Sequence, residues 1–315
     1  FRGMNMNERL INKKLQLPLK KFPEMGCANL GVMLDKTECR NLRNLINEKR
    51  PINPDIFYQN KEEFIKNGRW HKYAPGVGHN FIENMDLSFI EKNKKFIDSV
   101  TKVLGKNYTI KKKSVIRSVS SHYLPSWLHL YIKDVGRPNL NPFIKDEFQD
   151  VQYFYCTDYH QDKTRSESNF VTFYIYLDDV NREYSALRIL TGSHKSGMNS
   201  YPHNLRRSKE NKNTWFYTDS NGKNLKCKEE DIVGEAGLIS CFHGLTLHGT
   251  PINNSKDPRI SLRYLISPDD KNLENSLFGK ANKLIYGPQN IDIHRHDVEK
   301  DGSYLPIGSA LDSQE

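Results

Sequence analysis

The stretch Phe170-Val171-Thr172-Phe173-Tyr174-Ile175-Tyr176-Leu177 carries the clearest strand signal in this chain of 315 residues. Its residues are almost all β-branched or aromatic, and Asp178-Asp179 ends the run, which is the composition of a buried β-strand. Shorter runs of the same kind follow at 186–190, 238–242 and 259–266. Several short strands separated by turns predict an antiparallel β-sandwich or jelly roll.

The N-terminal third has the period of helices. Residues 35–50 are expected to form a helix because Asp35 can cap it, Glu38 completes a capping box, and apolar residues recur along one side. A second helix is expected over 86–104. Helices followed by strands indicate a mainly β fold with flanking helices, that is, α+β.

Three further β-rich segments lie between these helices and the Phe170 run. The first two, residues 115–123 and 127–132, are expected to be strands, and the third, residues 151–155, leads into the motif at 159–162. Residues 196–231 are polar, with few long apolar stretches, and are expected to form an insertion or lid.

Two polar motifs flank the Phe170 strand. The first is Tyr159-His160-Gln161-Asp162. On an extended segment residues i and i+2 point to the same side, so His160 and Asp162 could face one metal ion. Among 11 histidines one His-x-Asp by chance is roughly an even bet, and a loop with a solvated His and Asp is the alternative interpretation.

The second motif is His248-Gly249-Thr250-Pro251, which follows a predicted strand. His243 lies just upstream and is a rival ligand; His248 is preferred because the residues after it also fit a site. Two imidazoles and one carboxylate can occupy one face of an octahedron and leave the other positions open, as in mononuclear non-haem Fe(II) oxygenases.

Arg259 follows the second motif, and Ser261 would share a strand face with it. A guanidinium fork and a hydroxyl suit a carboxylate, such as that of a keto-dicarboxylate co-substrate. Arg263 lies on the same face by parity and competes for this role. A surface arginine in a salt bridge is the commoner fate of any single Arg.

Composition indicates a globular protein with a polar surface. Hydrophobic residues make up 37% of the chain, charged residues 27%, and the mean hydropathy is −0.73. The net charge is +9, but the lysines occur in short scattered runs, so nucleic acid is a disfavoured partner and an anionic small molecule a mildly favoured one.

The five cysteines form no CxxC pair, and no apolar stretch approaches ~20 residues. These observations predict a protein without a membrane span in a reducing compartment, the cytoplasm.

Taken in order, the motifs resemble those of the phytanoyl-CoA dioxygenase family of Fe(II)/2-oxoglutarate-dependent oxygenases. The motifs that carry the resemblance are Tyr-His-Gln-Asp at 159–162, Ile-Tyr-Leu-Asp-Asp at 175–179, Ala-Leu-Arg-Ile-Leu-Thr-Gly-Ser-His at 186–194, His-Gly-Thr at 248–250, and Asn-x-Ser at 253–255 with Arg259 after it. The resemblance covers about residues 26–268.

The resemblance implies a double-stranded β-helix (cupin-like jelly roll) with iron held by His160, Asp162 and His248. It also implies 2-oxoglutarate bound by Arg259, with Thr250 and Ser261 as further contacts. Family members often carry Trp where this chain has Tyr174, which would line the same site. The implied reaction consumes O2 and releases succinate and CO2. Related halogenases have a small residue at the position of Asp162, so an intact Asp favours hydroxylation or a related oxidation such as desaturation.

These observations divide the chain into an arm at 1–25, an oxygenase domain at 26–268 and a C-terminal extension at 269–315 packed on that domain. The leading hypothesis is oxidation of a small-molecule substrate. The alternatives are the same chemistry on a protein or nucleic acid, and a jelly-roll binding protein without catalysis. The sequence selects neither a particular substrate nor an oligomeric state.

Overall fold

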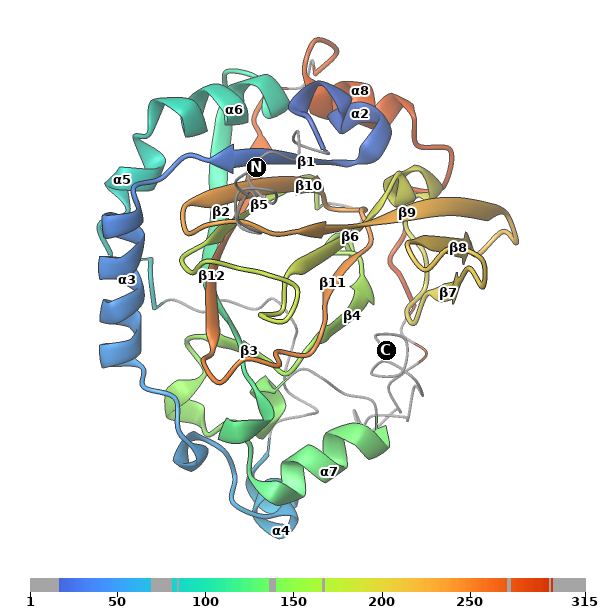
Figure 1. Cartoon of the computed structure of the whole chain (residues 1–315). Coiled ribbons are helices and arrows are strands. Elements are labelled where there is room, and N and C mark those ends of the chain that lie inside the picture. Colours follow the sequence, from blue (N-terminus) through green and yellow to red (C-terminus); the bar gives the residue numbers. More distant parts are fainter. Residues whose placement is uncertain are drawn as a thin grey trace, which may run out of the picture.

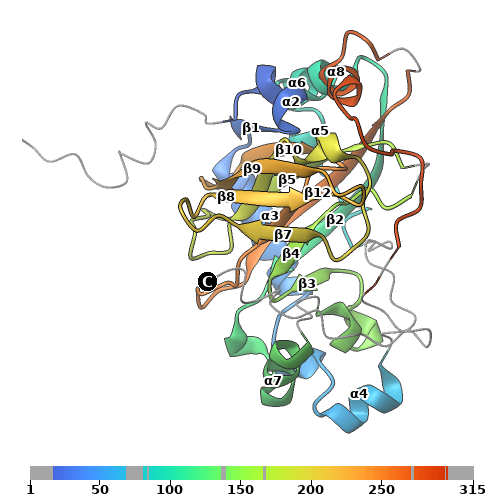
Figure 2. The same ribbon diagram turned by 90° about the vertical axis from the view of Figure 1, so that its right-hand side faces the viewer.

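The computed structural model describes residues 17–68, 81–83, 85–135, 140–165, 168–270, 273–294 and 296. Two six-stranded sheets face each other in this part of the chain, and helices lie along the side of α3 and α6, at the top and at the bottom in Figure 1, but not beside β7 and β8 (Figures 1 and 2). All strand pairs are antiparallel except β2 with β3. The expected jelly roll of mainly β class is therefore confirmed.

The major sheet has the strand order β1-β10-β5-β12-β2-β3. Its strands are β1 (Cys27–Val32), β2 (Tyr108–Ser118), β3 (Gln152–Phe154), β5 (Val171–Tyr176), β10 (Leu238–His243) and β12 (Arg259–Pro268). The minor sheet has the order β4-β11-β6-β9-β8-β7. Its strands are β4 (Thr157–His160), β6 (Leu187–Thr191), β7 (Asn204–Arg207), β8 (Thr214–Thr218), β9 (Asn224–Ile232) and β11 (His248–Thr250).

Helices cover the outer face of the major sheet. The α-helices are α2 (Phe22–Met25), α3 (Lys36–Lys49), α4 (Lys61–Asn67), α5 (Ser88–Glu91), α6 (Lys94–Leu104), α7 (Ser126–Val135) and α8 (Leu277–Lys283). Short 3-10 turns are η1 (Leu19–Lys21), η2 (Pro54–Ile56), η3 (Ser121–Tyr123), η4 (Asn141–Phe143), η5 (Asp146–Phe148) and η6 (Ser193–Ser196). Phe96 of α6 packs edge-on against Phe173 of β5 and Tyr264 of β12, so these aromatic residues join helix and sheet.

The inner faces of the two sheets share a second, smaller apolar cluster, in which Tyr174 and Tyr176 of β5 meet Leu187 and Ile189 of β6. The Tyr176 hydroxyl donates to the Ile232 carbonyl oxygen and accepts from the Leu187 N–H. A buried tyrosine thus ties one sheet to the other. Thr172 precedes these tyrosines on the same face.

Three local expectations change. Residues 127–132 form the middle of α7 rather than a strand. Pro125 lies just before this helix, and Leu128 and Ile132 are buried one turn apart. In a short segment, apolar residues four positions apart fit one face of a helix and one face of a strand equally well.

The helix expected over 86–104 is split into α5 and α6, because the Asn93 side chain accepts from the Phe96 N–H and starts a new helix. β2 begins and ends earlier than the strand expected at 115–123.

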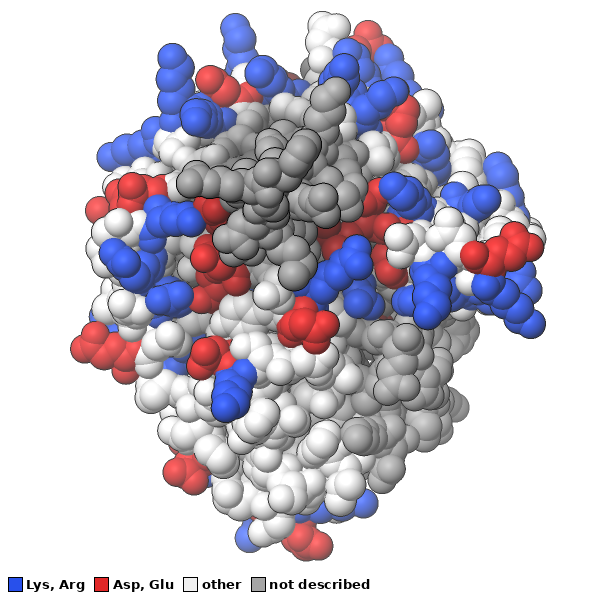
Figure 3. Space-filling view, in the orientation of Figure 1, with Lys and Arg blue, Asp and Glu red and all other residues white. Residues whose placement is uncertain are grey.

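The polar stretch 196–231 forms β7, β8 and most of β9, which extend the minor sheet; its role as a lid stays a prediction. Lys and Arg side chains gather over the upper helices and the β7–β9 side of the molecule, with Asp and Glu between them (Figure 3). In the described part of the chain, no helix is long and apolar enough to cross a membrane.

Both termini are described only in part. Of the expected arm, residues 1–16 lie outside the described residues, while Leu17 is buried. In the expected C-terminal extension, Phe278 of α8 stacks on His243 with ring centroids 4.9 Å apart. Residues 297–315 lie outside the described part.

Candidate metal centre

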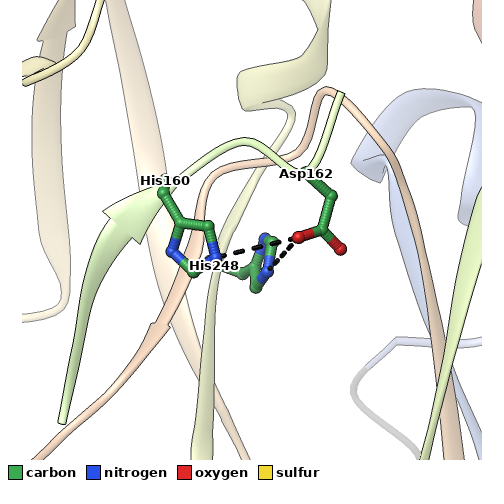
Figure 4. Close-up of side chains that lie close together, drawn as sticks. All are labelled: His160, Asp162 and His248. Atoms are coloured by element: carbon green, nitrogen blue, oxygen red, sulfur yellow. Dashed lines mark ion pairs between the residues drawn. The ribbon is translucent and has the colours of Figure 1, made fainter. Parts of the chain in front are cut away.

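His160, Asp162 and His248 meet between the two sheets. His160 ends β4 and His248 begins β11, and the two residues are paired across these antiparallel strands. Asp162 follows on the loop after β4. One ligand atom from each residue lies within 4.8 Å of the others, and the three side chains point toward one another (Figure 4).

Backbone carbonyl oxygens fix the tautomer of both imidazoles. Nδ1 of His160 lies 2.7 Å from the Asp158 carbonyl oxygen, and Nδ1 of His248 lies 3.0 Å from that of Thr246. Since a carbonyl only accepts, each Nδ1 donates to it, and in the neutral imidazole Nε2 is then the nitrogen whose lone pair can bind a metal. The two Nε2 atoms lie 3.8 and 3.6 Å from the same Asp162 oxygen, Oδ1.

The charge states also suit a cation. Burial raises the pKa of Asp162, but the charges of His248, Arg263 and His160 and a hydrogen bond from Thr172 outweigh it, and the pKa falls to about 2. Burial and the neighbouring His160 lower the pKa of His248 to about 4. At neutral pH the carboxylate is therefore ionised and this imidazole neutral, as a metal ligand must be.

Neighbouring residues hold the three side chains in place. The Thr172 hydroxyl donates to Oδ2 of Asp162 at 2.8 Å, which leaves Oδ1 turned toward the histidines. The centroid of the Phe242 ring lies 4.3 Å from the centroid of the His248 ring. A Cβ atom at Gly249 would lie 2.6 Å from the Thr157 carbonyl oxygen, so only glycine lets β11 approach β4 this closely.

Arg259 lies on the same inner face and is only 1% exposed. Its Nη1 donates to the Tyr174 hydroxyl at 3.1 Å and to the Ser261 hydroxyl, while its buried Nε has no hydrogen-bond partner. No carboxylate of the described residues forms an ion pair with it. A buried guanidinium with no directly paired carboxylate among the described residues is the arrangement that would receive the carboxylate of a ligand.

The structure thus groups Arg259 with Ser261 and Tyr174. Thr250 forms no hydrogen bond with these three described residues. Its hydroxyl lies 3.0 Å from the Thr157 hydroxyl, within hydrogen-bond distance. The role of each of these residues in binding a co-substrate stays a prediction.

The rival His243 lies elsewhere. It shares no metal-binding group with other residues in the described part of the chain, its Nε2 lies 3.0 Å from the Asn282 side-chain oxygen, and its Nδ1 accepts from the Leu245 N–H. Both nitrogens are therefore used within the fold. His294 and His296, near the C-terminus, form no metal-binding group with other described residues either.

Thr172 contributes to the site although no motif includes it, and the strand pattern carries a signal for it. Thr172 and Tyr174 are two residues apart in the Phe170 strand, so their side chains point to the same face of the sheet. If Tyr174 faces the site, Thr172 does too. Arg263 was considered only as a rival to Arg259. The structure places it beside Asp162, with Nη1 3.6 Å from Oδ1.

The comparisons with known proteins point to one family. A family model described as phytanoyl-CoA dioxygenase (PhyH) matches residues 24–261. No curated protein matches the chain.

Solved structures similar to this chain are distant. One is the non-haem α-ketoglutarate-dependent epimerase SnoN from nogalamycin biosynthesis, at 12% identity and TM-score 0.48, over 79% of this chain and 81% of that one. Another is EvdO2 from Micromonospora carbonacea var. aurantiaca complexed with 2-oxoglutarate, at 14% identity and TM-score 0.47, over 79% and 89%. The carbocyclase SnoK has 13% identity and TM-score 0.46, over 80% and 83%.

Proposed function

The chain belongs to the phytanoyl-CoA dioxygenase family of 2-oxoglutarate-dependent oxygenases, and from this premise we propose that it hydroxylates a small-molecule substrate. Its cofactors are Fe(II), 2-oxoglutarate and O2. His160, Asp162 and His248 are the proposed iron ligands, and Arg259 with Ser261 is the proposed site for the far carboxylate of 2-oxoglutarate.

One observation carries this proposal: two Nε2 lone pairs and one ionised carboxylate oxygen face a common point, with both Nδ1 atoms committed to backbone carbonyls. Two imidazoles and one carboxylate form the facial set that Fe(II) oxygenases use. The residues therefore fit the ion that the family requires.

Bound iron and 2-oxoglutarate together supply oxidative decarboxylation, with release of succinate and CO2 and oxidation of a C–H bond. The part of the protein is to orient the reactants. Thr172 holds the Asp162 carboxylate in place, and Arg259 offers a buried positive charge. Tyr174, which accepts a hydrogen bond from Arg259, would line the co-substrate site, and Thr250 would donate a hydrogen bond there.

The carboxylate at position 162 supports hydroxylation over halogenation, because a halide needs the position that this side chain takes. We assign the reaction to an oxygenase domain at 26–268, with 1–25 and 269–315 as flanking segments. All five cysteines are free and buried, which supports a reducing compartment, the cytoplasm.

The test is succinate release from 2-oxoglutarate under air with Fe(II), alone and with candidate substrates. We expect wild-type protein to release succinate, and His160→Ala and Asp162→Ala to release none above background, because each variant removes one ligand. His243→Gln is the matched control, since it removes an imidazole that serves the fold, and it should retain activity per folded molecule.

Undiminished succinate release in both ligand variants would contradict the proposal. Folded wild-type protein that binds neither Fe(II) nor 2-oxoglutarate would favour the alternative of a jelly-roll binding protein. Binding of nucleic acid with a steep dependence on salt would favour a macromolecular substrate.

A further inference from the structure

A second arginine, Arg263, lies on the inner face of the major sheet beside the proposed iron ligands. Its side chain is only 12% exposed, and its Nη1 is 3.6 Å from Oδ1 of Asp162. Among the described residues, Asp162 is its only ion-pair partner. Its buried Nε has no hydrogen-bond partner. This guanidinium is therefore poorly satisfied by the protein itself.

The atom that Arg263 approaches is the one that a metal would need. Oδ1 of Asp162 is also the oxygen nearest to Nε2 of both His160 and His248. Once this oxygen is committed to a cation, its charge is shared with that cation, and Arg263 loses much of its counter-charge. A largely buried guanidinium in that state is costly unless another anion joins it.

Lys112 adds a second positive charge on the same face. In the antiparallel register of β2 with β12, Ser114 pairs with Arg263, and Lys112 pairs with Leu265 in the next row. Paired residues share a face, so Lys112 follows Arg263 along the inner side. Burial and the charge of Arg263 lower the pKa of Lys112 to about 8, which still leaves it mostly protonated at neutral pH. Its acidic neighbour Glu83 is exposed.

The charges of the loaded site do not balance without a further anion. A ferrous ion and Asp162 leave one positive charge, 2-oxoglutarate brings two negative charges, and Arg259 brings one positive charge. These groups cancel, so the charges of Arg263 and Lys112 remain. Arg259 lies four residues before Arg263, roughly 13 Å along the strand, with its own hydroxyl partners in Tyr174 and Ser261.

We propose that Arg263 and Lys112 bind an acidic group of the substrate, a carboxylate or a phosphoryl group, close to the metal. The proposal rests on the proposed function and narrows it to acidic substrates. Arg263 is the main determinant, because its planar fork can hold two oxygens of one anion, and Lys112 supports it as a point charge.

The test measures binding near the metal rather than turnover. The protein is loaded with Mn(II) and 2-oxoglutarate, and 19F NMR follows three small probes: trifluoroacetate, its uncharged counterpart trifluoroacetamide, and monofluorophosphate. Mn(II) broadens the resonance of a fluorine that binds near it, and a Zn(II)-loaded sample gives the diamagnetic reference. We expect broadening with at least one of the two anions and none with the amide. The preferred anion tells carboxylate from phosphoryl recognition.

The variants assign the effect to residues. Arg263→Gln should weaken binding of the anion about 10- to 100-fold. Arg263→Lys keeps the positive charge and should retain part of the affinity that Arg263→Gln loses. Lys112→Gln should weaken it roughly 3- to 10-fold. Lys113→Gln is the matched control: it is the next residue of β2, points to the outer face, and pairs with Glu91 at 2.9 Å. Its effect should stay within about twofold.

Three outcomes would overturn the inference. The first is equal broadening of amide and acid, or of neither, in wild-type protein that binds Mn(II) and 2-oxoglutarate. The second is broadening that persists in Arg263→Gln, because the metal alone then attracts the anion. The third is an Arg263→Gln variant that loses affinity for 2-oxoglutarate rather than for the probe, measured by calorimetry. Wild-type protein that does not bind 2-oxoglutarate would instead overturn the proposed function itself.

Discussion

Two pairs of histidines lie side by side in this molecule, and they differ in what their ring nitrogens do. The ring centroids of His160 and His248 are 4.3 Å apart, and those of His194 and His243 are 5.7 Å apart. In the first pair each Nδ1 is bound to a backbone carbonyl and each Nε2 faces Asp162. In the second pair Nε2 of His194 is bound to the Pro23 carbonyl oxygen, and Nε2 of His243 to Asn282.

The comparison teaches that burial and proximity do not make a site. His194 and His243 are more deeply buried than His160, but they connect the N-terminal segment, β10 and α8. His160 and His248 keep a lone pair on the side where a carboxylate also points. The direction of the uncommitted nitrogen distinguishes a metal ligand from a structural histidine.

The largest expected effect separates His248 from His243. His248→Ala should lower the rate of 2-oxoglutarate turnover by about a thousandfold or more, because the loss of a ligand removes several kcal/mol of metal-dependent catalysis. His243→Ala should leave turnover per folded molecule within about threefold and lower the free energy of unfolding by about 2–3 kcal/mol. Turnover assays and chemical denaturation measure the two effects; the reverse pattern would break the comparison.

The same contrast should hold for two buried arginines on opposite faces of the major sheet. Arg259→Gln should weaken 2-oxoglutarate binding by roughly 30-fold or more, because it removes the charge proposed to meet the far carboxylate. Arg117 donates to the carbonyl oxygens of Arg50 and Ile46 and to Asn47 at the end of α3. Arg117→Gln should instead destabilise the fold by about 2–4 kcal/mol.

Calorimetric titration of 2-oxoglutarate and urea denaturation of both arginine variants check this prediction. If Arg117→Gln weakened 2-oxoglutarate binding as much as Arg259→Gln does, the distinction between the two faces of the sheet would be wrong.

A smaller effect concerns the orientation of the carboxylate. Thr172→Val removes the hydroxyl that donates to Oδ2 of Asp162 with little change of shape. We expect metal affinity to fall about 10- to 100-fold, as for other residues that hold a ligand in place. Thr109→Val is a matched control, since Thr109 also donates to an aspartate, Asp269, but at an exposed position. Equal affinities in wild type and Thr172→Val would remove Thr172 from the site.

The last prediction concerns the pH dependence of stability. Burial lowers the pKa of His194 to about 3 and that of His243 to about 4, with the charge of His243 as a further cause at His194. The unfolded chain takes up protons below pH ~6.5, whereas the folded chain resists them. Stability should therefore fall as the pH drops from about 6.5 toward 4, by up to about 1.4 kcal/mol per pH unit for each imidazole.

Urea unfolding of metal-free protein across this pH range measures the slope. His194→Gln and His243→Gln should each flatten it, because each removes a group that the unfolded state protonates. An unchanged slope in both variants would mean that these imidazoles are not held neutral by the fold.

The sequence was informative about strands and about facing directions. The Phe170 run is β5, and Tyr174, which only the family resemblance had indicated, lies in the apolar cluster on its inner side. The run that begins at Arg259 is β12, and parity placed Arg259, Ser261 and Arg263 on one face. A period of two residues needs no knowledge of the rest of the chain, because it follows from strand geometry alone.

The sequence could not show how far two residues on one face of a sheet lie from a residue of the other sheet. Parity cannot tell which of Arg259 and Arg263 lies near Asp162, because that depends on how β4 and β11 lie against β5 and β12. The misread segment at 127–132 has the same origin. Its apolar residues fit a strand or a buried helical turn, and packing against distant residues decided for the helix, as where Trp127 stacks on Phe64 of α4.

The most direct test of the account is the stoichiometry of Fe(II) in anaerobic equilibrium dialysis with 2-oxoglutarate present, compared among wild type, His248→Ala and His243→Ala. We predict one tightly held iron per chain in wild type and in His243→Ala, and no tightly held iron in His248→Ala. Iron retained by His248→Ala, or lost from folded His243→Ala, would contradict the assignment of His160, Asp162 and His248 as the metal centre.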